Sequence, residues 1–224
     1  MKKELLEKII ESYANRQSIA CLLNIETNEE IILKAGEKTE NEDLNEKISE
    51  CIKLDKSKLV TIKDKVYFID VYNPPLKLVI IGAVHIAQHL VLFAQGLNFD
   101  CILIDPRQGF ANHERFPDIT IYNNWPDEVL DEIDVDERTA IVTLTHDPKI
   151  DDVALKYVLK KNCFYIGSLG SKKTHQSRIN RLKGEYAEEY LNRIHGPIGL
   201  NIGARTPVEI ALSIMAEIIA KLRR

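Results

Sequence analysis

Polar and charged residues that could bind a phosphorylated ligand follow apolar runs in the second half of the chain. Asp105 and Arg107 come directly after the apolar residues 101–104. A carboxylate at such a position could accept hydrogen bonds from the hydroxyls of a ribose, and a guanidinium could donate hydrogen bonds to a phosphate. Polar residues also end the later apolar runs. The candidate ligand contacts at these run ends are Asp105, Arg107, Thr145, His146, Gly170, Ser171 and Lys172.

A glycine turn precedes these residues, at the end of the apolar run 78–81. Residues 82–87 read Gly-Ala-Val-His-Ile-Ala, against the dinucleotide-binding pattern G-x-G-x-x-G/A. Val84 replaces the middle glycine, and a β-branched side chain there crowds a pyrophosphate and disfavours positive φ. Asp105 lies about 20 residues past the turn, the spacing of an acid that binds ribose. The candidate ligand contacts of this turn are Gly82, Ala83, Val84 and His85. The competing interpretation is a strand–helix–strand unit that binds no ligand.

Other histidines and acids match metal or catalytic patterns only in part. His85 and His89 are four residues apart, as in a zinc-protease helix, but the glutamate of H-E-x-x-H is absent. His146, Asp147 and Asp151 could ligate a metal, although Asp147 as a helix cap and Asp151 as a solvated helix residue is the favoured interpretation. No Ser-His-Asp or Cys-His arrangement can be assigned. We therefore assign no metal site and no catalytic residue.

The elements that must position these residues alternate along the chain. From residue 76 onward apolar runs alternate with helical segments, which predicts an α/β fold: a Rossmann-like parallel sheet with helices on both faces. Ligands of such sheets bind outside the carboxyl ends of the strands, so the polar run ends should converge. We expect strands at about 78–81, 101–104, 119–122, 138–144 and 162–166, and helices at 84–97, 127–133, from 148, over the charged segment to 195, and at 206–222.

A small α/β domain should precede this sheet. Asn73-Pro74-Pro75 interrupts regular structure, because proline cannot donate to a strand ladder and restricts the residue before it. We therefore divide the chain into a domain of residues 1–73 and a Rossmann-like domain of residues 76–224. The first domain contains no catalytic pattern. Its expected elements are helices over 3–13 and 42–52, a hairpin of strands 18–25 and 31–34, and strands at 59–62 and 66–71.

Composition excludes several classes of protein. The net charge of −4 implies no general attraction to nucleic acid. No apolar run reaches the roughly 18 residues of a membrane span, and the charged, amphipathic N-terminus is unlike a signal peptide, so we expect a cytoplasmic protein without a membrane partner. The four cysteines form no C-x-x-C pair and should be buried thiols. The apolar last helix should pack against the sheet or against a second subunit in a homodimer.

Taken in order, these motifs resemble the C-terminal Rossmann domain of the XdhC/CoxI family, accessory proteins of xanthine dehydrogenase and related molybdenum hydroxylases. The family's glycine turn, Gly-Ala-Gly-His, is matched by residues 82–85 except at Val84. Its strand-end acid and arginine match Asp105 and Arg107, its Thr-His-Asp matches residues 145–147, and its Gly-Ser pair before basic residues matches 170–172. Further segments that carry the likeness are Arg115-Phe116-Pro117, 165–173 and 196–217.

The resemblance implies a molybdenum-cofactor chaperone, an accessory protein rather than an enzyme. Such a protein binds a molybdopterin-type cofactor, helps it to be sulfurated and delivers it to an apo molybdenum hydroxylase, with a sulfurtransferase as a further partner. Family members usually carry a Gly-Gly-Cys-x-Glu segment in their N-terminal part. Residues 1–73 contain none, and Lys34-Ala35-Gly36-Glu37 is the nearest glycine turn. A second protein could then complete the site.

Two other functions stay open on the sequence. One is an NAD(P)-dependent oxidoreductase, against which stand Val84 and the lack of an identifiable catalytic Tyr-Lys or His-Asp pair. The other is a non-catalytic interaction or sensor module with an empty or regulatory crevice. Nicotinamide binding with turnover would favour the first, and a fold that no ligand stabilises would favour the second.

Overall fold

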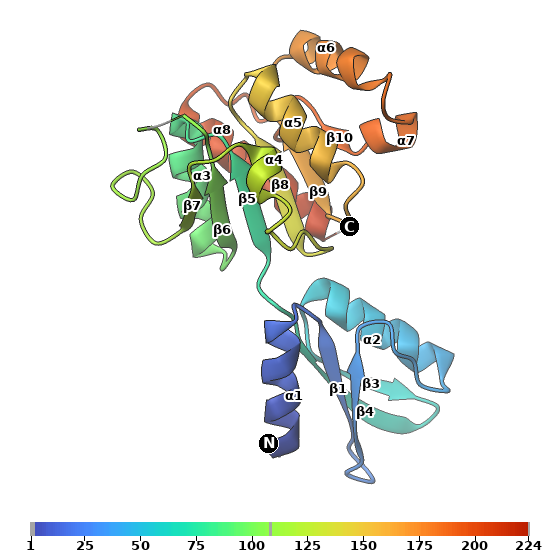
Figure 1. Cartoon of the computed structure of the whole chain (residues 1–224). Helices are drawn as coiled ribbons and strands as arrows, with labels where there is room; N and C mark the ends of the chain where they lie inside the picture. The colour runs from blue at the N-terminus through green and yellow to red at the C-terminus, as the bar shows by residue number, and fades with distance from the viewer. Residues whose placement is uncertain (1–2, 108, 224) are drawn as a thin grey trace. The chain divides into compact units, whose positions relative to one another are not determined.

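Two compact units make up the chain in the computed structural model, which describes residues 3–107 and 109–223 (Figure 1). The first unit ends at Pro74, and the second runs from Pro75 to Leu222. Two consecutive prolines cannot carry a strand ladder onward, because neither has an amide hydrogen. Each unit has its own sheet and its own apolar core.

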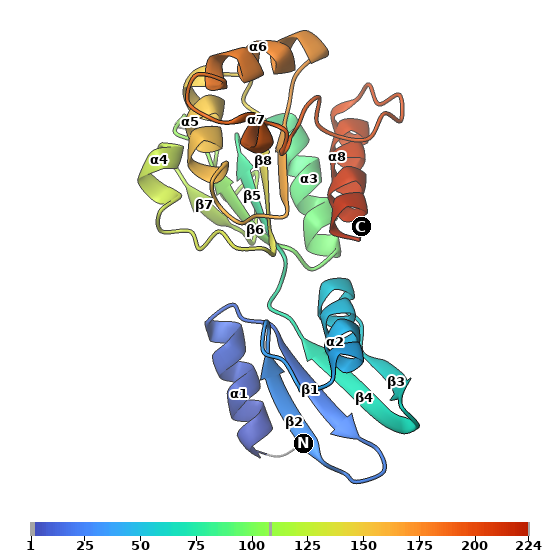
Figure 2. The same cartoon turned by 90° about the vertical axis from the view of Figure 1, so that its right-hand side faces the viewer.

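The first unit is a four-stranded antiparallel sheet with one helix on each face (Figure 2). Its elements, close to those that the sequence predicts, are α1 (Lys3–Ala14), β1 (Ile19–Asn24), β2 (Glu30–Lys34), α2 (Glu42–Leu54), β3 (Lys58–Ile62) and β4 (Lys65–Tyr72). The strands lie in the order β2-β1-β4-β3. Successive residues of β1 point to opposite faces, so Ile19 and Cys21 pack with α1, whereas Ala20 and Leu22 pack with α2.

The second unit is a six-stranded parallel sheet with the strand order of the dinucleotide-binding Rossmann fold. Its strands are β5 (Lys77–Ile81), β6 (Asp100–Ile104), β7 (Thr120–Tyr122), β8 (Thr139–Thr143), β9 (Tyr165–Ser168) and β10 (Ile194–His195). They lie in the order β10-β9-β8-β5-β6-β7. Numbered within this unit the order is 6-5-4-1-2-3, so it reverses between β5 and β8, and such a reversal is where this fold binds ligands.

Helices cover both faces of the parallel sheet, which confirms the predicted fold class (Figure 2). One face carries α3 (His85–Gly96) and α8 (Pro207–Leu222), and the other carries α4 (Pro126–Val129), α5 (Pro148–Val158), α6 (Lys172–Leu182) and α7 (Glu188–Leu191). Strand β5 is buried along its whole length: Leu78 and Ile80 face the first layer, and Val79 and Ile81 face the second. Burial on both faces explains why this strand reads as a continuous apolar run.

Three elements differ from the sequence-based expectation. Strand β9 begins at Tyr165 rather than at residue 162, and α4 is a single turn. The charged helix expected to reach residue 195 ends at Leu182, beside Gly184, and α7 and β10 follow it. Because β10 consists of Ile194 and His195 alone, it is too short to show the alternation that identifies a strand.

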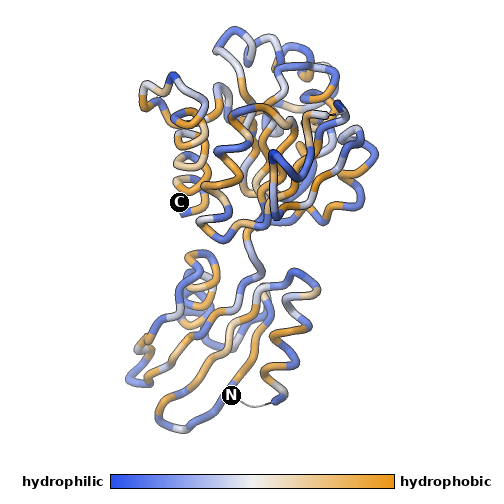
Figure 3. The backbone as a smooth tube through the Cα atoms, turned by 90° about the vertical axis from the view of Figure 1, so that its left-hand side faces the viewer, coloured by the Kyte–Doolittle hydropathy of each residue, from blue (hydrophilic) through white to orange (hydrophobic). Residues whose placement is uncertain are grey.

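Helix α8 is apolar but only partly covered. Ile214, Met215 and Ile218 are buried, whereas Val208 and Leu212 are 42% and 50% exposed. Figure 3 shows this helix, which ends beside the C-terminal label, mostly in the orange of apolar residues. Neither α8 nor another helix within residues 3–107 and 109–223 combines the length and the apolar character needed to cross a membrane.

The turn after β5 requires a glycine at position 82. The φ of Gly82 is +113°, which L side chains rarely adopt. An added Cβ would lie 2.7 Å from Thr145 Cγ2 and 3.1 Å from Thr145 N. The ends of β5 and β8 therefore approach each other too closely for any side chain at this position.

We expect Gly82→Ala to lower the free energy of unfolding by about 2–4 kcal/mol, because the variant combines an unfavourable φ with a close contact in a packed turn. Gly96→Ala is the matched control, because an added Cβ at the end of α3 meets nothing within 4 Å. That control should be neutral or stabilising by up to about 1 kcal/mol. Urea unfolding measures both variants, and equal stabilities would contradict the close approach of β5 and β8.

Candidate functional site

The turns after β5, β6 and β8 lie close together at the carboxyl edge of the parallel sheet. Gly82 of the β5 turn packs closely against Thr145 of the β8 turn. The charge of Arg107, which follows β6, interacts with the carboxylates of Asp147 and Asp151 at the start of α5. These turns flank the reversal of strand order between β5 and β8, so we call the region that they line the switch-point crevice.

Asp105 is the buried centre of the switch-point crevice, with 0% of its surface exposed. Its Oδ2 accepts hydrogen bonds from the Ala83 amide at 2.7 Å and from Arg107 Nη2 at 2.6 Å. Its Oδ1 accepts from the amide and Nε of Arg107 at 3.0 and 2.8 Å. Burial alone would raise the pKa of this carboxyl, but the bonds from Arg107 and Ala83 outweigh burial and hold the pKa below its ordinary value. The ionised carboxylate therefore joins the end of β6 to the glycine turn of β5.

This arrangement turns the acid inward, away from a ligand. A ribose would have to displace Arg107 to reach Asp105, and the Ala83 amide is already bound. Val84 is the N-cap residue of α3 with φ −84° and ψ 172°, so the strain expected for a valine at positive φ does not arise. His85 begins α3 and is exposed.

Arg107 is the charged group that the crevice presents, with 33% of its side chain exposed. Its guanidinium carbon lies 4.6 Å from the centroid of the Phe110 ring, and its Nη1 has no hydrogen-bond partner among the described residues. Arg115 fastens the loop after β6 to the start of α3. Its Nη1 donates to the Ala83 carbonyl at 3.0 Å, and its Nη2 donates to Gln88 Oε1 at 3.2 Å.

A second buried carboxylate shapes the turn after β8. The expectation that Asp151 is solvated is wrong, since it is 1% exposed. It accepts hydrogen bonds from the Thr145 amide at 3.2 Å, Thr145 Oγ1 at 2.6 Å and the His146 amide at 3.1 Å. His146 has a φ of +63°, uncommon for a non-glycine residue, and its side chain is exposed. Burial raises the pKa of Asp151 despite its bonds from Thr145. Asp147 caps α5 as predicted, accepting from the Lys149 amide.

The turn after β9 lies beside the turn after β8, because these strands are paired. Gly170 has a φ of +147°, and an added Cβ would lie 2.9 Å from Thr174 Cβ. Ser171 is the N-cap of α6, and its Oγ accepts from the Thr174 amide at 3.1 Å. Lys172 begins the helix and is exposed. The predicted residues of this turn thus form a helix start at the same edge of the sheet as the crevice.

A half-buried polar cluster holds the glycine-rich loop 196–203 that follows β10. Glu217 accepts hydrogen bonds from the Tyr165 hydroxyl at 2.5 Å and from the Gly199 amide at 2.8 Å, and its Oε1 lies 3.5 Å from His195 Nδ1. Burial would raise the pKa of Glu217, but the bonds from His195 and Tyr165 lower it. The pKa of Tyr165 is raised by burial and by this carboxylate. The cluster joins β9, β10 and α8 and gives His195 a partner.

Neither metal ligation nor thiol chemistry is indicated in the described residues. No three His, Cys, Asp or Glu side chains within residues 3–107 and 109–223 are grouped to hold a metal ion. All four cysteines are buried and form no disulfide, as the sequence predicts. Burial, together with the nearby Asp100, raises the pKa of Cys101 to about 12. No cysteine thiolate is therefore presented to a ligand.

The buried positions of two polar residues, Asp151 and Arg178, and the partly buried position of Glu217 were not recognised from the sequence. Asp151 stands four residues before Leu155 on the buried face of α5, and Arg178 stands four residues before Leu182 on the buried face of α6. A charged residue on the apolar face of an amphipathic helix is the signal that could have identified the first two.

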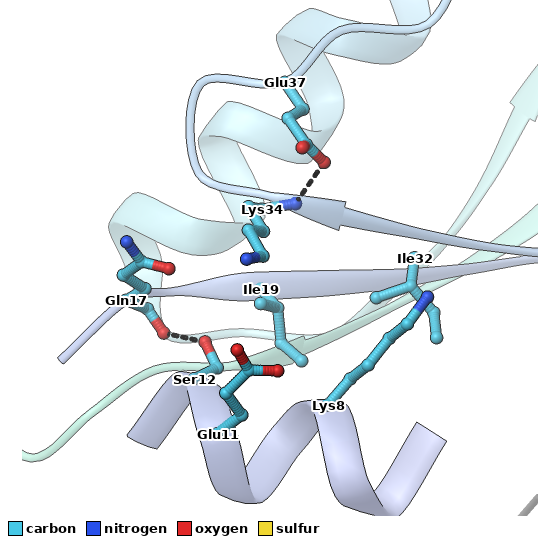
Figure 4. Close-up of a pocket in the computed structure, with 8 residues that line it drawn as sticks. All are labelled: Lys8, Glu11, Ser12, Gln17, Ile19, Ile32, Lys34 and Glu37. Carbon is cyan, nitrogen blue, oxygen red and sulfur yellow. Dashed lines mark hydrogen bonds between the residues drawn. The ribbon is translucent and has the colours of Figure 1, made fainter. Parts of the chain in front are cut away.

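The first unit has a separate pocket of about 220 Å³ between α1 and strands β1 and β2 (Figure 4). Its charged lining residues are Lys8 and Glu11 of α1, Lys34 at the end of β2, and Glu37, which accepts a hydrogen bond from the Lys34 amide at 2.8 Å. The balanced charges indicate no particular ligand class.

The fold and the strand-end turns define a Rossmann-type domain whose strand-end acid, Asp105, is bound to Arg107 of the same turn. The family model of the XdhC Rossmann domain matches residues 78–218. The chain belongs to the XdhC family, as the sequence motifs predict.

Three relatives are similar to part of this chain. The protein YqeB of Escherichia coli K12 is 32% identical over 155 residues, which are 68% of this chain and 28% of YqeB. A probable xanthine dehydrogenase subunit of Bacillus subtilis 168 is 31% identical over 159 residues, 70% of this chain and 46% of that protein. The molybdenum cofactor insertion chaperone PaoD of E. coli K12 is 32% identical over 102 residues, 45% of this chain and 31% of PaoD. The chain spans less than half the length of each relative.

A solved structure shares the fold of nearly the whole chain. It is a crystal structure described as a xanthine dehydrogenase from Bacillus halodurans, with a TM-score of 0.73 and 24% identity. The match covers 98% of this chain and 64% of that chain. Both units of this chain therefore have counterparts in that fold.

We expect Asp105→Asn to lower the free energy of unfolding by about 2–3 kcal/mol, because it leaves Arg107 without its buried anion. Asp152→Asn is the matched control. Asp152 also forms two bonds with an arginine, Arg181, but that side chain is 41% exposed, so we expect about 1 kcal/mol or less.

The same pair of variants tests the charge of Asp105. A carboxyl with a lowered pKa stabilises the fold above its unfolded-state value of 3.8 and loses that contribution as the pH falls through the lower folded-state pKa. The stability gap between wild type and D105N should therefore shrink below pH 3.8. Urea unfolding between pH 7 and the acid limit of folding measures it; a gap that stays constant would contradict an ionised Asp105.

Proposed function

We propose that this chain is a molybdenum-cofactor binding chaperone that assists the maturation of a xanthine dehydrogenase-type molybdenum hydroxylase. The observation that carries this proposal is the grouping of polar turn residues at the strand-order reversal of an XdhC-family Rossmann domain. The similarity to PaoD, named as a molybdenum cofactor insertion chaperone, supports it. The cofactor is cargo in this proposal, and the chain is an accessory protein rather than an enzyme.

The donor groups of the crevice suit the organic part of this cargo. Molybdopterin carries a phosphate and a hydrogen-bonding pterin ring, and the polar side chains presented here are the partly exposed Arg107 and the exposed His146. The four cysteines are buried, so this chain offers no thiolate to the metal. We propose that the predicted contacts after β5, β6, β8 and β9 bind the cargo. Asp105 orients the guanidinium of Arg107 without touching the ligand, whereas Arg107 and His146 contact the ligand directly.

The proposed partners follow from the same function. An apo molybdenum hydroxylase would receive the cargo, and a sulfurtransferase would supply sulfur, for which this chain presents no thiol of its own. The exposed Val208 and Leu212 on α8 support the proposal of a homodimer. We also propose a cytoplasmic location, where thiols such as these four stay reduced.

An NAD(P)-dependent oxidoreductase fits this geometry less well. Dinucleotide domains use a free strand-end carboxylate on the ribose and open turn amides on the pyrophosphate. Here the Asp105 carboxylate accepts hydrogen bonds from Arg107 and from the Ala83 amide, so neither the carboxylate nor that amide is free to bind a dinucleotide. The position of Val84 at the N-cap of α3 adds bulk where a pyrophosphate would approach.

We expect the purified chain, incubated with an extract rich in molybdenum cofactor, to retain a pterin in about equimolar amount. The pterin is measured by its fluorescence after oxidation. Retention should fall about 10- to 100-fold in Arg107→Met, because a charge-assisted hydrogen bond to the ligand is lost.

Arg181→Met is the control, because Arg181 forms an equivalent pair with Asp152 between α5 and α6 and not in the crevice. It should retain pterin like the wild type. Retention of NAD, NADP or FAD in place of a pterin would replace the proposed function with an oxidoreductase. If the chain retains neither a pterin nor one of these nucleotides, a non-catalytic Rossmann interaction module becomes the favoured function.

A further inference from the structure

Two helices of the second unit begin at the carboxyl edge of the parallel sheet beside turns predicted to bind a ligand. Helix α3 begins after the β5 turn, and α6 begins after the β9 turn. The N-terminus of a helix attracts anions, because its first amides lack intrahelical partners. The chemistry around these two N-termini differs, and the difference bears on where a phosphate binds.

The turn before α3 is poorly equipped for a phosphate. Its Ala83 amide already donates to Asp105, and its N-cap residue, Val84, has no polar side chain. The charge of the nearby Arg107 is compensated by Asp105 through two side-chain hydrogen bonds, and it also interacts with Asp147. Little uncompensated positive charge is left at this end of α3.

The turn before α6 offers a row of amide donors instead. The Thr174 amide is capped by Ser171 Oγ, but no described residue accepts a hydrogen bond from the amides of residues 170–173. Gly170, with a φ of +147°, bends the chain so that this row can form an anion-binding concavity. Lys172 and Lys173 follow directly, and both are exposed.

A buried cation beneath this turn points independently to a ligand. Arg178 is 2% exposed, and its Nη2 donates to the carbonyl of Leu169, which opens the turn. Its Nε and Nη1 are buried and have no hydrogen-bond partner within the described chain. His175, one turn earlier on α6, also has a buried Nδ1 without a partner there. Asp151 and Asp152 attract this guanidinium and Arg181 repels it, but its Nε and Nη1 donors have no hydrogen-bond acceptor within the described chain, which a bound anion could supply.

We infer that the turn of residues 169–173 is the phosphate subsite of this protein, and that the glycine turn of β5 is not. The ligand class is a phosphomonoester or a pyrophosphate, held by the free amides, Lys172 and Lys173, with the charge of Arg178 below them. The cargo assignment rests on the proposed function, but the subsite can be tested with inorganic pyrophosphate alone. In this arrangement the pterin end of the cargo extends from the subsite across the β8 turn to Arg107.

A matched pair of N-cap variants tests the inference: Ser171→Asp and Val84→Asp. Aspartate is a favourable N-cap residue, so both helices should remain folded, and thermal unfolding verifies this for each variant. Each substitution places a negative charge at one of the two candidate anion sites. Titration calorimetry of the full chain with pyrophosphate at low ionic strength measures the affinity.

We expect S171D to weaken pyrophosphate binding at least tenfold, and to weaken it more than V84D does, because the inferred phosphate subsite lies at the start of α6. The reverse pattern would overturn the inference and return the phosphate to the β5 turn. Wild-type protein that binds no pyrophosphate at millimolar concentration would also overturn it, even if a pterin is retained. If S171D weakens pyrophosphate binding but the wild-type chain retains no pterin, the phosphate subsite is supported and the proposed chaperone function is contradicted.

Discussion

The architecture of the switch-point crevice depends on the ion pair between Asp105 and Arg107. A carboxylate with no solvent contact must be compensated inside the protein, and Arg107 does this with its amide and two side-chain nitrogens. The remaining hydrogen bond, from the Ala83 amide, joins the end of β6 to the turn after β5. A guanidinium fixed in this way and stacked on Phe110 has little rotamer freedom left to lose when a ligand binds. The buried charge of Asp105 therefore fixes both the position of the turn after β5 and the orientation of the Arg107 guanidinium.

Asp151 repeats this arrangement at the β8 turn with a different electrostatic outcome. Its donors are a hydroxyl and two amides, with no cation in hydrogen-bond contact, so burial dominates and its pKa is raised, whereas that of Asp105 is lowered. An acid whose pKa is higher in the folded state destabilises the fold when ionised, and the penalty is relieved as the pH falls through that pKa. The two carboxylates thus respond to acid in opposite directions. Ionised Asp151 nonetheless gives the turn its conformation, and its charge lies near that of Arg178.

The fold was predictable wherever burial leaves a periodic pattern in the sequence. The wholly buried strand β5 reads as an apolar run, and the glycine turn and α3 follow it at the expected positions. Strand β10 was missed because its two residues are too few to show the alternation of apolar and polar side chains that identifies a strand. The end of α6 was missed because the charged sequence of the helix continues past Leu182.

The ligand crevice was predictable only as a location. Parallel strands bring their carboxyl ends to one edge, so the convergence of Asp105, Arg107 and the Thr145–His146 turn follows from fold class alone. Whether an acid faces the ligand or the protein depends on tertiary hydrogen bonds, such as that from Ala83 to Asp105, which no spacing reveals. For the same reason Asp151 was assigned to solvent although it is buried.

The left-handed backbone of His146 has a consequence for how this sequence can evolve. Glycine, asparagine and aspartate adopt a φ of +63° more readily than histidine does, so single substitutions at this position could relieve local strain. Drift under selection for stability alone would be expected to remove the imidazole. Under the proposed function, selection on the ring itself would be needed to keep a histidine at this strained position.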